Sequence, residues 1–188
     1  MQPSAAVLRR AWRIVFFPAS EWDATGAECR PWNTVLFGYA LPLAFLPAAG
    51  WALGSALSGK AAEFSLGKMI LSATGTVALS VLSVALLAFA FYLISPMYRL
   101  ERRWNRAVEV AAYGSTPVLL AGVLMVLPVL VMVSVVAMLH SFFLYYLGVQ
   151  KLLGCRRSEA AEFLAVACLL TAIASLGLGA GGGALGVL

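Results

Sequence analysis

Charged residues are scarce in this chain: Asp, Glu, Lys and Arg make up only 11% of its 188 residues. Soluble domains carry about 25% charged residues, so this composition excludes a water-exposed globular protein. Histidine is represented only by His140, and the three cysteines (Cys29, Cys155, Cys168) have no metal-binding spacing. Their odd number also argues against a disulfide framework. We therefore expect an integral membrane protein that holds no metal or other cofactor.

Catalytic signatures are missing as well. The sequence contains no HExxH, GxSxG or P-loop motif, which would indicate a zinc protease, a serine hydrolase or a nucleotide-binding enzyme. The net charge of +5 comes from short basic clusters between apolar runs. That pattern is typical of loops that set membrane orientation, and it does not indicate nucleic-acid binding. These absences predict a protein that is not an enzyme and binds no nucleic acid.

Long apolar stretches account for most of the chain, which is 62% hydrophobic. A transmembrane helix needs about 20 apolar residues to cross a hydrocarbon core of about 30 Å. The stretch 107–149 is about twice that long, and we divide it into two helices joined by a hairpin turn at Pro128. The sequence thus predicts an all-α membrane protein with a segment 1–33 and a five-span domain 34–188. The expected spans are 34–57, 69–94, 107–127, 129–149 and 162–183.

Basic residues favour one orientation of these five spans. Only Lys60 and Lys68 fall on the side opposite the N-terminus. Eleven basic residues fall on the N-terminal side: Arg9, Arg10, Arg13, Arg30, Arg99, Arg102, Arg103, Arg106, Lys151, Arg156 and Arg157. Because Lys and Arg concentrate in cytoplasmic loops, we expect a cytoplasmic N-terminus and a C-terminus outside.

An amphipathic helix is expected in the segment 1–33. At about 100° per residue, Leu8 and Trp12 share one side of this helix with other apolar residues, opposite Arg9, Arg10 and Arg13. Such a helix lies in the membrane interface with its cations toward anionic headgroups; docking on the cytoplasmic end of the bundle is an equally good interpretation. Headgroup or partner contacts are also expected for part of RLERRWNR (Arg99, Arg102, Arg103, Arg106), whose alternative role is to determine topology alone.

The third span contains residues that usually form turns, Tyr113-Gly114-Ser115-Thr116-Pro117. Pro117 has no N–H to donate to the Tyr113 carbonyl, so we predict a helix kink at Gly114 and Pro117. The hydroxyls of Ser115 and Thr116 are available to bond the backbone groups that the kink leaves free.

Ionisable and polar groups at this depth are functional candidates by default. The candidate intramembrane cluster comprises Glu109, Tyr113, Ser115, Thr116 and His140. In a hairpin that turns at Pro128, His140 lies at the depth of Thr116, so we expect the kink to pack near His140. Alternatively, Glu109 pairs with Arg106 three residues earlier, and His140 only bonds a neighbouring helix.

A family resemblance is carried by AYGSTPVLLAGVLMVLP, then HSFFLYYLGVQKLLG, then a polar SEAAEF before the last span. This order resembles the YIP family of Ypt/Rab-interacting membrane proteins, over about residues 16–174 and most specifically over 111–154. An early FFPASEW resembles the bacterial branch. The resemblance implies five spans and a cytoplasmic N-terminus. Eukaryotic members act in vesicle trafficking through small GTPases, but this chain lacks their long polar N-terminal region and their Asp-Leu-Tyr-Gly-Pro type motif.

The function expected from these features is that of a non-enzymatic protein that organises membranes, has a trafficking-type role or scaffolds partner proteins, in a bacterial inner membrane. Its expected partners are the lipid bilayer, other membrane proteins and further copies of itself. One alternative is a small transporter or lipid-handling protein with a polar path at Glu109, Thr116 and His140. Another is a structural subunit of a larger membrane complex.

Overall fold

The computed structural model describes residues 3–57, 66–126 and 130–184, and every regular element in these ranges is a helix. Five of these helices are long and apolar enough to cross a membrane: Trp32–Leu57, Gly67–Tyr98, Trp104–Leu124, Met132–Leu152 and Ala160–Gly177. The all-helical, five-span fold is thereby confirmed, with each span starting two or three residues from its predicted position. The predicted turn at Pro128 lies outside the described residues.

Two helices, not one, precede the first span. Helix α1 (Pro3–Phe16) ends just before Pro18, which opens α2 (Pro18–Glu28). Proline is well suited to the first position of a helix because its missing N–H would have no partner there. Cys29 then ends α2 in the left-handed conformation, with φ of 42°. The chain turns at this point and enters the membrane domain at Trp32.

The first span is a composite of three helical segments. The short α3 (Trp32–Val35) widens into the π-helical turn η1 (Leu36–Ala40) before continuing as α4 (Leu41–Leu57). Pro42 has no N–H for the carbonyl of Gly38, and the helix widens just before this proline. The widened turn places the Tyr39 side chain, which is buried, against the third span.

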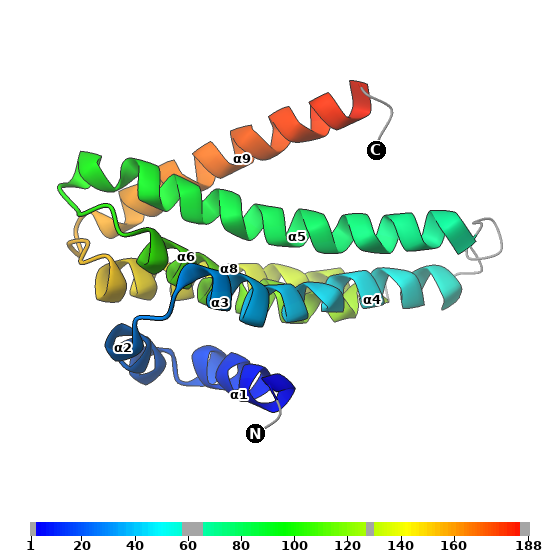
Figure 1. Ribbon diagram of the computed structural model, residues 1–188, viewed down its shortest axis with the longest axis horizontal. Coiled ribbons are helices and arrows are strands. Elements are labelled where there is room, and N and C mark those ends of the chain that lie inside the picture. Colours follow the sequence, from blue (N-terminus) through cyan, green and yellow to red (C-terminus); the bar gives the residue numbers. More distant parts are fainter. Residues whose placement is uncertain (1–2, 58–65, 127–129, 185–188) are drawn as a thin grey trace.

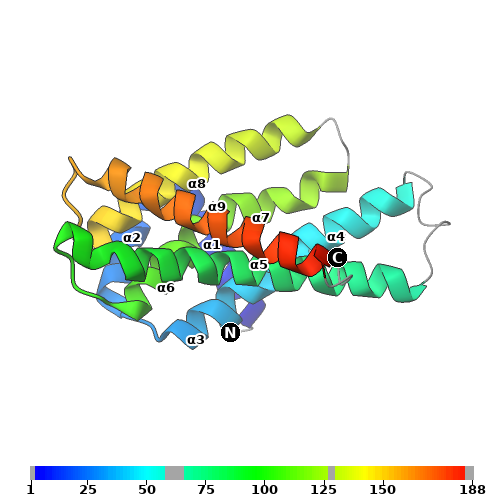
Figure 2. The same ribbon diagram turned by 90° about the horizontal axis from the view of Figure 1, so that it is seen from above.

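The second span is α5 (Leu66–Ile94), extended by the 3-10 helix η3 (Ser95–Tyr98). The third span consists of α6 (Trp104–Gly114), α7 (Thr116–Ala121) and the 3-10 helix η4 (Gly122–Val126). The fourth span is α8 (Val131–Leu152) and the fifth is α9 (Ala160–Ala184). Figure 1 shows α4, α5 and α8 running along the long axis, with α1 and α2 on one side of this bundle. Figure 2 shows α9 crossing over α5, while α7 and α8 diverge from α4 and α5 toward one end of the bundle.

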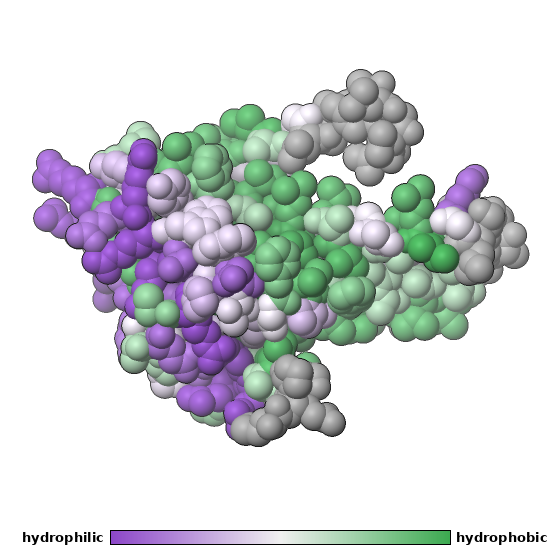
Figure 3. Space-filling view, viewed as in Figure 1, coloured by the Kyte–Doolittle hydropathy of each residue, from purple (hydrophilic) through white to green (hydrophobic). Residues whose placement is uncertain are grey.

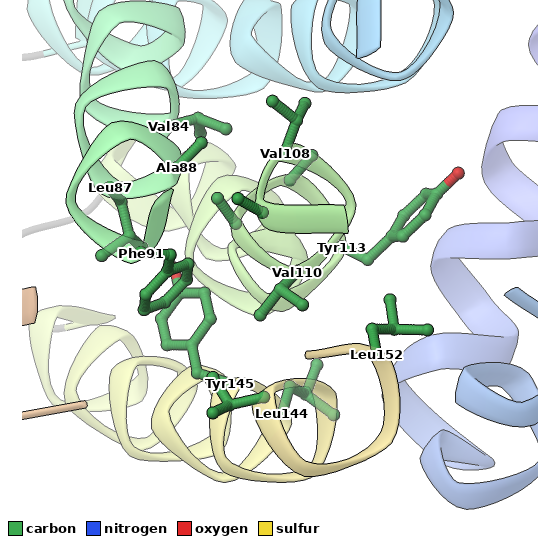
Figure 4. Close-up of a cluster of buried hydrophobic side chains, with 14 of the residues drawn as sticks. Val84, Leu87, Ala88, Phe91, Val108, Val110, Tyr113, Leu144, Tyr145 and Leu152 are labelled. Carbon is green, nitrogen blue, oxygen red and sulfur yellow. The ribbon is translucent and has the colours of Figure 1, made fainter. Parts of the chain in front are cut away.

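The third span is the centre of the bundle. Its most apolar window is 78% buried, whereas the corresponding values for the other spans lie between 22% and 44%. Figure 4 shows Phe91 of α5 and Tyr145 of α8 packed around α6, whose Tyr113 points the other way, toward the N-terminal helices. An irregularity in this span therefore contacts neighbours on every side.

Hydrophilic side chains gather at one end of the bundle, where α5 ends, α6 begins, α8 ends and α9 begins. We call this the basic end. Figure 3 shows that the hydrophilic surface continues from there along α1 and α2. Away from the basic end, the membrane-spanning helices present a hydrophobic surface in this view. The N-terminal helices are thus a polar extension of the basic end.

Candidate functional site

The third span is interrupted at Ser115, between α6 and α7, within the stretch where the sequence predicts a kink. The Thr116 hydroxyl donates a hydrogen bond of 2.7 Å to the Tyr113 carbonyl, which Pro117 cannot reach with an N–H. The Thr116 oxygen also lies 2.7 Å from the Tyr39 hydroxyl. Because a threonine hydroxyl has one proton, Tyr39 must donate to Thr116, which in turn donates to the carbonyl.

A second pair of hydroxyls lies beside the break. Ser115 donates to the Ala111 carbonyl at 2.7 Å, and its oxygen lies 2.7 Å from the Tyr145 hydroxyl, which by the same one-proton argument is the donor. Gly114 allows this approach, because a Cβ atom added there would overlap the Tyr145 ring. Tyrosines from the first and fourth spans therefore bond the two hydroxyls at the break.

The break packs against the fourth span, as expected, but the hydrogen bond there does not come from His140. Its Nε2 atom lies 3.0 Å from the Val15 carbonyl of α1, which fixes Nε2 as the donor. The contact with Ser115 comes instead from Tyr145, further along α8. A 3-10 helix rises about 2 Å per residue against 1.5 Å in an α-helix, so η4 makes the third span longer than an α-helix of the same number of residues.

Glu109 is paired inside the protein. It is 0% exposed, accepts a 2.8 Å hydrogen bond from Arg106, and also accepts the Arg30 backbone N–H at 2.9 Å. Arg106 donates further to the carbonyls of Thr25 and Gly26 at the end of α2. From the sequence we expect Arg106 to contact headgroups or a partner. In the structure its guanidinium instead points inward and joins α2 to α6.

The other arginines expected at headgroups fall into two places. Arg99 follows η3 in the left-handed conformation, and Arg103 forms an exposed ion pair with Glu101 at the basic end. The Arg102 guanidinium lies 5.6 Å from the ring of Tyr92. Arg9, Arg10 and Arg13 lie on α1 and, with Arg30, line a cavity beside the first span.

Ion pairs hold α1 against α2 along this cavity. The buried carboxylate of Glu21 lies 3.2 Å from Arg10 Nε and 2.8 Å from Arg13 Nε. Glu28 pairs with Arg10 at 2.7 Å and with Arg30 at 2.8 Å. Arg10 also donates to the Tyr113 hydroxyl at 3.0 Å, which connects the ion pairs to the third span just before its break.

The pKa values of these groups reflect the pairing. Burial alone lowers the pKa of Arg10, but Tyr113 and Glu28 outweigh that effect, so its pKa is raised above the ordinary value of an arginine. Burial likewise raises the pKa of Glu28, but the hydrogen bond and charge of Arg10, together with Arg30, bring its pKa below the usual 4.5. Both groups are therefore charged at neutral pH.

Two further contacts dock α2 on the bundle. Trp22 is fully buried, and a Cβ atom at Gly148 of α8 would come within 2.8 Å of its ring. Lys151 at the end of α8 forms an ion pair with Asp23. The small residue at position 148 thus admits the largest side chain of α2.

Of the predicted cluster, the structure brings together Tyr113, Ser115 and Thr116, while Glu109 and His140 bond separate partners. Sequence reasoning missed Tyr39, Tyr145, Glu21 and Glu28. A tyrosine within an apolar span was the available signal for the first two. Within the described ranges, no group of three His, Cys, Asp or Glu residues is placed to hold a metal ion.

The sequence model of the Yip1 domain matches residues 12–179 of this chain. Because the match covers most of its length, the chain belongs to the Yip1 domain family, and the resemblance to the YIP family is confirmed. No curated protein and no solved structure matches the chain. Family membership and five apolar spans together identify an integral membrane protein.

Proposed function

We propose that this Yip1 domain protein is a non-enzymatic membrane protein that organises the bilayer around it, with α1 and α2 as the acting part. In this proposal the basic end faces the cytoplasm and the C-terminus lies outside, as the distribution of Lys and Arg favours. The proposed location is a bacterial inner membrane, which the resemblance of FFPASEW to the bacterial branch supports.

The two faces of α1 carry the proposal. Ala11 and Ile14 of α1 are buried against the rest of the protein, whereas Trp12 of α1 and Phe17, which directly follows α1, each expose 61% of their surface. Aromatic side chains of this kind prefer the boundary between headgroups and acyl chains. The ion pairs of Glu21 and the bond between His140 and Val15 fix the helix to the bundle. A docked helix with aromatic rings outward adds volume to one leaflet only and so favours a curved bilayer.

A transport function has less support. Glu109, Thr116 and His140 bond Arg106, Tyr39 and the Val15 carbonyl respectively, so each of the three is already engaged with a different partner. Among the described residues, these three side chains do not form one polar cluster. The contacts around α1 therefore favour membrane organisation.

Vesicle deformation tests the proposal. The full chain is reconstituted at increasing density into vesicles of phosphatidylcholine and phosphatidylglycerol, and vesicle shape is measured by electron cryo-microscopy. We expect curved or tubular vesicles with the unmodified chain and near-spherical ones with a Trp12→Ala/Phe17→Ala variant.

The control variant is Phe37→Ala/Phe45→Ala, which removes two aromatic rings of similar exposure (54% and 58%) from the first span. This variant should still deform vesicles. Spherical vesicles with the unmodified chain, or equal loss in both variants, would contradict the proposal. Crosslinking that recovers one stoichiometric integral membrane partner would favour the structural-subunit alternative instead.

A further inference from the structure

A cavity of about 390 Å³ lies between α1, α2, the start of the first span and α6. Its lining includes four arginines and two glutamates: Arg9, Arg10, Arg13, Arg30, Glu21 and Glu28. Two positive charges therefore lack a carboxylate in the lining. A concave site with excess positive charge attracts an anion.

The four arginines differ in whether they already form ion pairs within the protein. Arg10, Arg13 and Arg30 pair with Glu21 or Glu28. Arg9, by contrast, has no hydrogen bond or ion pair with any other described residue. The cavity thus combines a pre-assembled frame of guanidinium groups with one arginine whose donors are all available. Arginine is the side chain best suited to bind phosphate oxygens with two parallel hydrogen bonds.

Neutral donors complete the lining. Tyr113 accepts the hydrogen bond from Arg10 through its oxygen, which leaves its own hydroxyl proton free to donate. Thr34, at the start of the first span, adds a second hydroxyl. Val7 and Gly38 supply apolar walls on either side. A phosphate ester beside apolar groups would find donors and a surface for hydrocarbon in one place.

The position of the cavity relative to the membrane narrows the ligand class. The arginines of α1 line the cavity, while Leu8 and Trp12 of the same helix are exposed. If α1 lies at the level of the headgroups, as the proposed function holds, the cavity is at the level of lipid phosphates. We infer that it binds the phosphate of an anionic phospholipid headgroup through Arg9, Arg13 and the Tyr113 hydroxyl. This inference rests on the proposed function for the depth of α1.

Native mass spectrometry of the full chain in detergent tests the site by counting bound lipids during titration. The probes are phosphatidylglycerol and diacylglycerol with the same acyl chains, of which only the first carries a phosphate. Phosphatidylglycerol should bind more tightly. The Arg9→Gln variant should weaken its binding roughly tenfold, because one charge-assisted contact is lost. Thr34→Val should weaken it less, by about two- to fourfold.

Arg157→Gln is the matched control. It removes the same charge from another exposed arginine, which lies in the loop before α9 and does not line the cavity. This variant should leave the affinity within about twofold of the unmodified chain. Circular dichroism of all variants checks that the helices are retained. Equal binding of diacylglycerol, or an equal effect of Arg9→Gln and Arg157→Gln, overturns the site.

Inorganic phosphate distinguishes the two sources of the same chemistry. If millimolar phosphate displaces phosphatidylglycerol only weakly, the lipid is the ligand. If free phosphate instead binds at Arg9 and phosphatidylglycerol gains nothing from its acyl chains, the lipid assignment is overturned. The proposed function has its own test, which is the shape of vesicles that contain the unmodified chain or the Trp12→Ala/Phe17→Ala variant. If the unmodified chain deforms vesicles but binds phosphatidylglycerol no more tightly than diacylglycerol, the site alone is refuted and the proposed function stands.

Discussion

The side-chain hydroxyl of Thr116 bonds the backbone carbonyl of Tyr113 at 2.7 Å, replacing the N–H that Pro117 lacks. The interruption of the third span is therefore satisfied from within the same helix, and Tyr39 adds the next donor from the first span. Hydrogen bonds of this kind inside a membrane domain contribute about 0.6 to 1.7 kcal/mol, because the unfolded chain also finds other partners for its polar groups. The break is thus a fixed feature of the fold with two spans holding it.

Replacing Thr116 tests this arrangement. Thr116→Val keeps the side-chain volume but removes both the donor to Tyr113 and the acceptor for Tyr39. We expect a loss of about 0.6 to 1.7 kcal/mol in unfolding free energy, measured by denaturation in mixed micelles. A double-mutant cycle with Tyr39→Phe should show that the two losses are not additive. Thr171→Val is the control, because its hydroxyl donates to the Ala167 carbonyl of its own helix and bonds no other described residue; an equal loss there would contradict the role of Thr116.

The contact between Gly114 and Tyr145 gives a second prediction. Gly114→Ala places a Cβ atom into the Tyr145 ring, so α8 must move or the ring must rotate away from Ser115. We expect destabilisation of about 1 to 3 kcal/mol in the same denaturation assay. Gly75→Ala in α5 should be neutral or slightly stabilising, because no atom lies within 4 Å of the added Cβ. Equal changes in unfolding free energy for the two alanine variants would show that the close approach at Gly114 does not contribute to stability.

These two contacts separate what the sequence could predict from what it could not. The break follows from one local fact, the missing N–H of Pro117, and the nearest hydroxyls were identifiable from spacing alone. The residue of α8 that opposes the break was not predictable, because the relative position of two packed helices is not encoded in hydrophobic spacing, which also does not distinguish a 3-10 segment such as η4 from an α-helical one. His140 was therefore expected where Tyr145 lies.

The ion pairs between the two N-terminal helices could not be predicted from the sequence either. The basic side of α1 was readable from its periodicity, as were the five spans from length and hydropathy. No pattern in the sequence distinguishes Glu21 and Glu28, and only the folding of α2 back on α1 makes them partners of Arg10. Charge pairing across a turn depends on how the two helices pack, which a single amphipathic pattern does not specify.

Arg106 provides a test of how α2 is held. Arg106→Met removes the charge that pairs with fully buried Glu109 and frees the carbonyls of Thr25 and Gly26. We expect a loss of about 3 to 5 kcal/mol and faster proteolysis within α2. Adding Glu109→Leu should recover part of the stability, because the buried carboxylate is then gone.

Arg103→Met is the comparison for this experiment. Its ion pair with Glu101 is exposed, so its loss should cost at most about 1 kcal/mol. Intact α2 in the Arg106→Met variant, or equal losses at positions 103 and 106, would contradict the anchoring role.

Acid should weaken the contact between α1 and α2 through Glu28. Its pKa in the folded protein lies below the usual value of 4.5, so the folded state favours the charged carboxylate. The resulting stability is fully present above pH 4.5 and is lost as the pH falls through the lower folded value. We expect the melting temperature of the unmodified chain to fall in this acidic window more than that of Glu28→Gln, which cannot titrate at position 28. Parallel melting curves for the two chains would contradict the linkage.

The orientation of the basic end is open to a direct experiment. The positive-inside rule weighs Lys and Arg in short loops, and the segments at the basic end contain most of them. A reporter inserted after Lys151 should therefore behave as cytoplasmic, and one fused at Leu188 as external. Replacing Arg99, Arg102 and Arg103 with Gln should reduce the cytoplasmic fraction, because these three belong to one loop and are not buried. Both reporters on the same side of the membrane would be incompatible with five spans.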